Sequence, residues 1–326
     1  MLMRHRKNPI LKPRGFDWEG AAVFNPAAAC IDGKIHLLYR AVGDYWNYAS
    51  SLGHAVFGED LELIERDPEP VFCPDARTWE PSVEDARLVE IEGELFITYV
   101  ITPTPFPPGG VRLRLGIPKR EMAITKIGLA RVSRDFGRFE RLGIITPWDA
   151  DERDTVLFPK RIQGKYAALH RPSNWIGPEY GCERPGIWFA YLDGLPGRKY
   201  GHRLVMAPEE PWESYKIGPG APPIETEEGW LLIYHGVDGE RIYRAGAALL
   251  DLEEPWRVIA RAKEPILVPE ASYELEGDMP RVVFPEGAVV FREELLVFYG
   301  AADKVCCVAS VPMRKLLGWL LATGRR

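Results

Sequence analysis

The sequence has little cysteine, and its cysteines lack the spacing that is typical of disulfide frameworks and metal sites. Its five cysteines, Cys30, Cys73, Cys182, Cys306 and Cys307, form no Cys-X-X-Cys pair, and two of them are adjacent. An odd number without regular spacing argues against a disulfide framework and against a cysteine-based metal site. The six histidines are scattered, so we predict no bound metal.

Long apolar runs and a strong net charge are also missing. No hydrophobic stretch reaches the length of a membrane-spanning helix, and the basic residues 1–13 contain no apolar segment of the kind found in a signal peptide. A formal net charge of −6 does not indicate binding to nucleic acid or to a membrane surface. We therefore expect a cytoplasmic protein without nucleic-acid or membrane partners, and a homo-oligomer stays open.

Helical periodicity is scarce, whereas glycine (31) and proline (29) recur along the whole chain. Short alternating or apolar runs lie between these turn residues, which is the pattern of an all-β protein. Only residues 312–324 show helical spacing of apolar residues, so they predict a short C-terminal helix. No domain boundary is visible, and we expect a single domain over 1–326 with residues 1–20 as an N-terminal extension.

One cassette occurs five times: a tight polar turn followed by an apolar strand that ends in an aromatic or polar residue. The copies span residues 32–40, 92–99, 163–171, 228–236 and 292–300, so successive copies begin 60 to 71 residues apart. Such regular repetition is typical of a repeat architecture, and the period fits one four-stranded blade. The sequence therefore predicts an all-β fold, a five-bladed β-propeller with a short C-terminal helix.

The ends of the repeated strands carry candidate functional side chains. Equivalent strands of successive blades present their ends to the central channel, where a propeller is expected to hold its site. The residues at these ends are Arg40, Tyr99, His170, Arg171, His235 and, just beyond the last cassette, Asp303. A single arginine or histidine of this kind is often structural, but the shared place in the repeat favours a functional interpretation.

The segment from Trp79 to Arg87, WEPSVEDAR, concentrates three carboxylates and an arginine directly before an apolar strand. Such a segment between apolar neighbours indicates that Glu84 and Asp85 are held at a cleft. Arg87 can keep one of them ionised while the other is freed for proton transfer. On local sequence alone, a turn with a structural salt bridge explains the segment equally well.

Familiar nucleophile and phosphate motifs are missing. No nucleophile elbow supports a serine triad, and the Gly-Pro segment headed by Lys216 has the wrong spacing for a P-loop. Glycosidases instead use two carboxylates across the scissile bond. Phosphorylases replace the water and its base with phosphate, which basic side chains must bind. The basic strand ends at Arg171 and His235, with Arg153 and Tyr243 nearby, favour phosphorolysis.

These motifs together resemble glycoside hydrolase family 130, which contains inverting β-mannoside phosphorylases and related β-mannosidases. The resemblance runs from about Asn25 to Ser310 and rests on residues 82–87, 157–159, 164–172, 229–237, 243–247, 250–252 and 300–303. It implies a five-bladed propeller, in agreement with the cassette count. It also implies phosphorolysis of manno-oligosaccharides, or of mannosyl-glucose or mannosyl-N-acetylglucosamine, to α-mannose 1-phosphate. Inorganic phosphate is then the co-substrate, and no cofactor is needed.

The resemblance implies roles for individual residues. Asp85 matches the general acid. Asn25, Arg40, Glu84 and Asp303 match positions that hold the mannose beside the scissile bond, and Arg153, Arg171, Lys216, His235 and Tyr243 match phosphate-binding positions. Because Asp85 must hold a proton at working pH, we expect its pKa to be raised and Arg87 to pair with Glu84 instead.

The sequence departs from the family pattern in two places. Ser82 and Ala86 replace the glycine and proline of the usual Gly-Val-Glu-Asp-Pro-Arg motif. The proline-rich, basic segment 103–120 is longer than the pattern suggests, and we expect it near the acceptor sugar. The linkage (β-1,4 or β-1,2) and the acceptor stay open. A β-mannosidase that uses water and a non-catalytic sugar-binding propeller are the alternatives.

Overall fold

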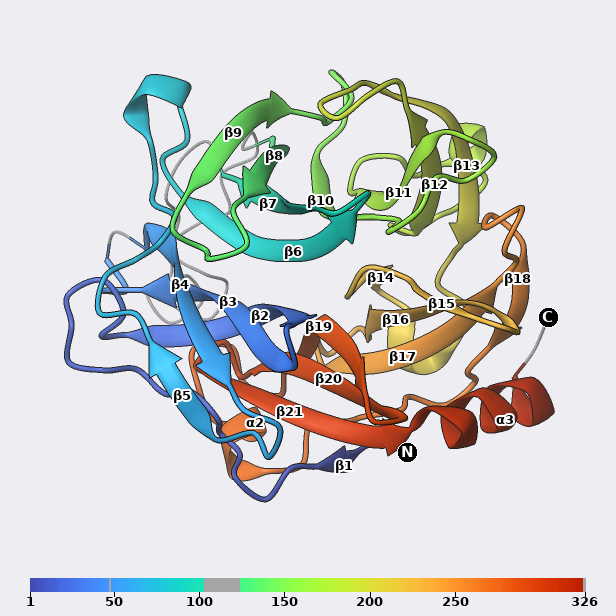
Figure 1. Cartoon of the computed structure of the whole chain (residues 1–326). Coiled ribbons are helices and arrows are strands. Elements are labelled where there is room, and N and C mark those ends of the chain that lie inside the picture. Colours follow the sequence, from blue (N-terminus) through green and yellow to red (C-terminus); the bar gives the residue numbers. More distant parts are fainter. Residues whose placement is uncertain (47, 103–123, 325–326) are drawn as a thin grey trace.

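The computed structural model describes residues 1–46, 48–102 and 124–324. Its strands form five antiparallel sheets arranged as blades around a central axis (Figure 1). The prediction of a five-bladed β-propeller is confirmed. Each predicted cassette covers the first turn and the second strand of one blade, because a tight polar turn followed by a buried apolar run is what a central strand requires.

The first three blades each contain four strands, which follow one another from the axis outward. Blade 1 is β2 (Ala22–Ile31), β3 (Lys34–Val42), β4 (Ser50–Phe57) and β5 (Leu63–Arg66). Blade 2 is β6 (Val83–Ile91), β7 (Glu94–Ile101), β8 (Lys126–Val132) and β9 (Phe139–Ile144). Blade 3 is β10 (Glu152–Leu157), β11 (Tyr166–Pro172), β12 (Ile187–Leu192) and β13 (Lys199–Met206).

Blades 4 and 5 depart slightly from this plan. Blade 4 is β14 (Lys216–Pro219), β16 (Gly229–Val237), β17 (Tyr243–Leu250) and β18 (Val258–Arg261), with β15 (Ile224–Thr226) also paired to β16. Blade 5 is β19 (Val283–Phe291), β20 (Glu294–Ala301), β21 (Val305–Pro312) and β1 (Met3–Arg4). The segment 1–20, expected as an extension, therefore supplies the outer strand of the last blade.

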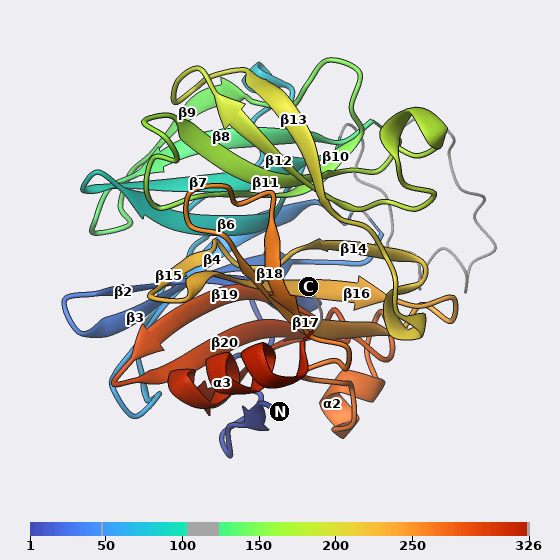
Figure 2. The ribbon, with the colours of Figure 1, turned by 90° about the vertical axis from the view of Figure 1, so that its right-hand side faces the viewer.

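Helices are few and short in the part of the chain that the structure describes. They are α2 (Ser272–Leu275), α3 (Met313–Thr323) and the 3-10 turns η1 (Ala76–Thr78), η2 (Pro178–Tyr180) and η3 (Pro211–Glu213). The predicted C-terminal helix is confirmed as α3, which lies alongside the propeller (Figure 2). Leu316, Leu317 and Leu320 bury its apolar side against blades 4 and 5. No described helix is long and apolar enough to cross a membrane.

The core consists of apolar layers between neighbouring blades. Alternate residues of each strand face opposite sides of its sheet, so each blade contributes to two layers. One layer joins blades 1 and 2 through residues such as Leu38 and Ile97, and another joins blades 3 and 4 through Phe158 and Trp230. The segment 103–120, expected near the acceptor sugar, lies outside the described residues.

The five blades also share a buried polar triad. A tyrosine of the second strand, or a histidine in blade 3, binds a buried glutamate that precedes this strand in the chain. A basic residue of the outermost strand pairs with the same glutamate. The triads are Tyr39–Glu19–Arg66, Tyr99–Glu80–Arg141, His170–Glu152–Lys199, Tyr234–Glu213–Arg261 and Tyr299–Glu274–Arg4. Because each partner is hydrogen-bonded, these buried charges are compensated.

These triads correct one prediction from the sequence. Tyr99 and His170 are expected from the repeat to face the central channel, but both are members of a triad inside their blades. The neighbouring Arg171 does face the channel, since adjacent strand residues point to opposite sides of the sheet.

Candidate active site

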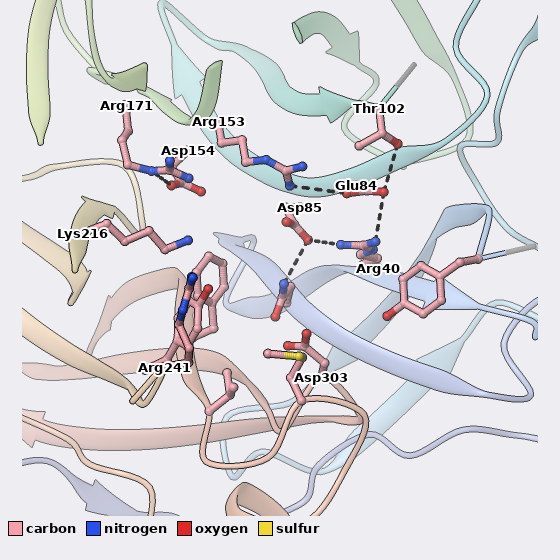
Figure 3. A pocket seen from close by; sticks show the side chains of 16 residues that line it. Arg40, Glu84, Asp85, Thr102, Arg153, Asp154, Arg171, Lys216, Arg241 and Asp303 are labelled. Carbon is pink, nitrogen blue, oxygen red and sulfur yellow. Dashed lines mark hydrogen bonds and ion pairs between the residues drawn. The ribbon is translucent and has the colours of Figure 1, made fainter. Parts of the chain in front are cut away.

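One end of the central channel contains a cavity of about 340 Å³. The inner strands and the ends of the second strands supply its wall (Figure 3). Nine of the ten residues predicted from the sequence line it, namely Asn25, Arg40, Glu84, Asp85, Arg153, Arg171, Lys216, Tyr243 and Asp303. The structure thus gathers side chains from all five blades into one polar pocket.

β-Bulges in the inner strands aim several of these side chains into the channel. The strand register shifts at Asn25 in β2, at Asp85 in β6 and at Asp154 in β10. All three residues have a left-handed backbone, with φ of 50°, 49° and 54°. A bulge turns a side chain away from the regular alternation and is frequent beside active sites. The repeated bulge explains why equivalent positions in three blades carry polar pocket residues.

Asp85 is held on one side by two donors. Its Oδ1 accepts from Asn25 Nδ2 at 2.9 Å and from Arg40 Nη1 at 3.0 Å, whereas no described residue donates to Oδ2. Burial raises the pKa of Asp85, but Arg40, Arg87 and the bond from Asn25 outweigh burial and lower the pKa overall. The expectation of a raised pKa for Asp85 is therefore wrong.

Arg87 does not pair with Glu84, so that expectation is also wrong. Its guanidinium lies fully buried, donates to the carbonyl of Asp85 at 2.7 Å and to that of Gly220 at 2.5 Å, and pairs with Glu286 at 2.5 Å. Arg87 thereby connects blades 2, 4 and 5 and supports the Asp85 bulge. Glu84 instead pairs with Arg40 at 3.1 Å.

The opposite side of the pocket is mostly cationic. Arg171 Nε donates to Asp154 Oδ2 at 2.6 Å. Burial raises the pKa of Asp154, but Arg171 and the other cationic groups around it, Arg87 and Lys216 among them, together outweigh burial and hold that pKa well below its usual range. Gly218 allows this pair to form, because a Cβ at this position would lie 2.5 Å from the Asp154 carboxylate.

Two further cations face this side. Burial and the nearby Arg171 lower the pKa of Lys216 to about 7, with Asp154 acting in the opposite direction. Arg153 is partly exposed and lies 3.9 Å from Glu84, too far for a hydrogen bond. Arg153 therefore keeps hydrogen-bond donors available for an anion, although its charge is partly balanced by Glu84.

His235 lies behind the pocket wall and does not line it. Its ring is fully buried, stands 3.7 Å from Asp154 and stacks on Tyr243. Burial lowers its pKa well below the usual value, so the imidazole is neutral. Burial also raises the pKa of Tyr243 to about 12, so its hydroxyl keeps its proton. His235 thus stands beside the cationic side without adding charge to it.

Several residues that line the pocket are not among those predicted from the sequence. They are Tyr48, Thr102, Asp154, Arg241, Met279, Val282 and Phe284. Asp154 could have been found, because Glu84-Asp85 and Arg153-Asp154 stand at equivalent positions before repeated strands. Burial raises the pKa of Asp303 to about 7, helped by Asp85 and Asp278 and opposed by Arg40.

Among the described residues, no group of three histidines, cysteines or acids could hold a metal.

The chain matches known proteins over nearly its whole length. The family model for glycoside hydrolase family 130, described as beta-1,4-mannooligosaccharide phosphorylase, matches residues 2–322. A 1,2-beta-oligomannan phosphorylase of Thermoanaerobacter is 38% identical over 97% of this chain and 98% of its own. The solved β-1,2-mannobiose phosphorylase of Listeria innocua superposes with a TM-score of 0.81 at 27% identity, covering 98% of this chain and 99% of its own.

The fold and the pocket first define a class of protein, a five-bladed propeller whose central pocket contains both carboxylates and cations. The matches then give the family: this chain belongs to glycoside hydrolase family 130. A second solved structure, described as a family 130 glycoside hydrolase that targets β-1,2 mannosidic linkages, covers 95% of this chain and 93% of its own. It has a TM-score of 0.75 at 24% identity and shows the same fold.

Proposed function

We propose that this protein cleaves β-mannosides with inorganic phosphate and releases α-mannose 1-phosphate. The observation that carries the proposal is the separation of charge in the pocket. Asp85 and Glu84 pair with Arg40 and lie with Asp303 on one side, and Arg171 and Lys216 lie on the other side with Asp154. Arg153 lies between the two sides, 3.9 Å from Glu84. We propose that the sugar binds between Asp85 and the phosphate in this pocket.

The state of Asp154 argues for phosphate rather than water as the nucleophile. A base that activates water works best with a pKa near the working pH. Asp154 is the carboxylate on the cationic side, and its ion pair with Arg171, together with the other cationic groups around it, holds its pKa well below the usual range. It is therefore a weak base, whereas bound phosphate is already a nucleophile.

The cations bind the phosphate and orient one of its oxygens toward the anomeric carbon. Arginine and lysine side chains form charge-assisted hydrogen bonds to such an oxyanion. Attack from the face opposite the leaving sugar inverts the anomeric centre. Holding both reactants in this geometry lowers the barrier without any covalent enzyme intermediate.

Asp85 gives the proton to the leaving sugar. The neighbouring protein groups lower its pKa, but a bound phosphate dianion adds negative charge nearby. Negative charge raises the pKa of a carboxyl and of an amine alike. Phosphate binding therefore favours the protonated forms of both Asp85 and Lys216, which the reaction needs.

The relatives suggest which substrates to test first. Proteins named for β-1,2-linked mannosides are 38% and 37% identical over 97% of this chain, while the family model is described by β-1,4-mannooligosaccharides. We propose β-1,2-mannobiose as the first substrate, with phosphate as co-substrate, no cofactor and a cytoplasmic site of action.

The test is an incubation of the protein with β-1,2- and β-1,4-mannobiose, with and without phosphate. We expect α-mannose 1-phosphate, identified by NMR, only when phosphate is present. Asp85→Asn should lower kcat by roughly 10²–10⁴-fold, as for loss of a general acid. Release of free mannose at the same rate without phosphate would show a hydrolase, and full activity of the variant would remove Asp85 from the mechanism.

A further inference from the structure

Arg241 is a pocket cation that neither the repeat nor the family motifs single out. It lies at the tip of the turn between β16 and β17 and, like Tyr243, lines the pocket. Figure 3 shows it on the same side of the pocket as Lys216. Its side chain is exposed to solvent. It therefore stands at the mouth of the cationic side, where an anion arriving from solvent passes.

The turn is built to present this side chain. Asp238 Oδ1 accepts from the backbone N–H groups of Glu240 and Ile242, at 2.9 and 3.1 Å. Arg241 itself has a left-handed backbone with φ of 65°, which is uncommon for a residue with a side chain. Its guanidinium lies 3.6 Å from the centre of the Tyr215 ring, a cation–π contact that fixes its direction.

The charge of Arg241 is left without a carboxylate partner among the described residues. The two acids of the same turn are engaged by other arginines: Asp238 by Arg244 at 2.7 Å and Glu240 by Arg281 at 3.1 Å. This arrangement keeps a full positive charge at the pocket mouth.

The deeper cations do not supply that charge as reliably. Asp154 compensates Arg171, and Lys216 has a pKa of about 7, so about half of it is neutral near that pH. A charge at the entrance also acts at longer range, because a charged cleft steers small ions toward itself.

We propose that Arg241 is an anion-capture residue, which draws phosphate into the pocket and binds the phosphoryl group of a sugar 1-phosphate in the reverse reaction. This inference rests on the proposed function for its biological meaning. The binding it describes can be measured without turnover.

The test compares Arg241→Gln and Arg241→Lys with the wild type. Arg198→Gln is the matched control, since Arg198 is 95% exposed and lies in the turn at the end of blade 3 away from the pocket. We expect Arg241→Gln to weaken phosphate binding in calorimetry about tenfold, or about 1.4 kcal/mol. At low salt, its kcat/KM for phosphate should also fall about tenfold. This kcat/KM should depend less on KCl concentration than that of the wild type, while kcat and the KM for mannoside stay unchanged.

The variants separate charge from stacking. Arg241→Lys should keep the salt dependence, because the charge remains, and Arg198→Gln should match the wild type. The inference would be overturned if Arg241→Gln kept the phosphate affinity and salt dependence of the wild type. It would also be overturned if this variant lost only thermal stability. If the wild type binds phosphate but releases free mannose, the proposed function fails while calorimetry still decides on Arg241. If the wild type binds no phosphate, both fail.

Discussion

At the scale of single residues, the pocket holds groups whose protonation depends on what is bound. Burial places Asp303 and Lys216 both near a pKa of 7, although one is an acid and the other a base. With these pKa values, neither side chain is fixed in one protonation state at neutral pH. A bound dianion next to Lys216 keeps it charged.

Lys216 therefore gives the enzyme a pH dependence that can be separated from the rest. As pH rises through about 7 in the free enzyme, Lys216 loses its proton and the pocket loses a positive charge. We predict that kcat/KM for phosphate falls above this pH in the wild type and falls less in Lys216→Arg, because arginine stays charged. Steady-state rates across the pH range test this. Equal alkaline declines in both proteins would contradict the prediction.

At the scale of elements, close approaches between strands are as important as the strands themselves. Tyr39 of β3 reaches its triad by crossing over Gly53 of β4, where a Cβ would lie 2.2 Å from the tyrosine ring. The ring and its hydrogen bonds to Glu19 and Arg66 leave no room for a side chain. The glycine is required by packing, not by its backbone angles.

A pair of glycine substitutions tests this packing. Gly53→Ala should destabilise the protein by about 1–3 kcal/mol, the usual cost of overpacking. The control is Gly318→Ala on the exposed side of α3, where a Cβ meets no atom within 4 Å. It should stabilise by about 0.5–1 kcal/mol, because alanine favours a helix. Urea unfolding of both variants gives the free energies, and a neutral Gly53→Ala would show that the ring can move.

The sequence could predict the second strand of each blade, because a polar turn followed by an apolar run is a local signal. It could also place Arg40, Arg171 and Asp303 near one channel, since strand ends of a repeat share a position. The bulge at Asp154 and the direction of Tyr99 could not be predicted, because they depend on hydrogen bonds between distant segments. The pairing of Arg87 with Glu286 likewise joins two blades that no local pattern relates.

At the scale of the whole molecule, one triad closes the ring. Arg4 of β1 pairs with the fully buried Glu274, 270 positions away in sequence, and Met3 pairs with Ser310 of β21. In blades 1 and 2 the triad comes from a single stretch of chain, whereas in blade 5 it joins the two ends of the sequence. Arg4 therefore pairs with the buried glutamate of blade 5, as Arg66 pairs with that of blade 1.

Replacing Arg4 should weaken the closure. In Arg4→Ala the buried Glu274 keeps Tyr299 and two backbone donors but loses its counter-charge. We predict a loss of roughly 1–3 kcal/mol, the usual cost of removing a charged hydrogen-bond partner. Arg6→Ala, at an exposed position in the same segment, is the control and should unfold like the wild type in urea. Equal stability of both variants would show that β1 contributes little.

The pairing of β1 with β21 also sets the order in which the molecule can assemble during synthesis. β1 is synthesised before the other described strands, but its partner strand β21 ends at Pro312. Domains generally form from the N-terminus as the chain emerges, so the earlier blades can pair their own strands while β1 waits unpaired. The ring therefore closes only after β21 has been made, so β1, the earliest of the described strands in the sequence, is among the last to pair.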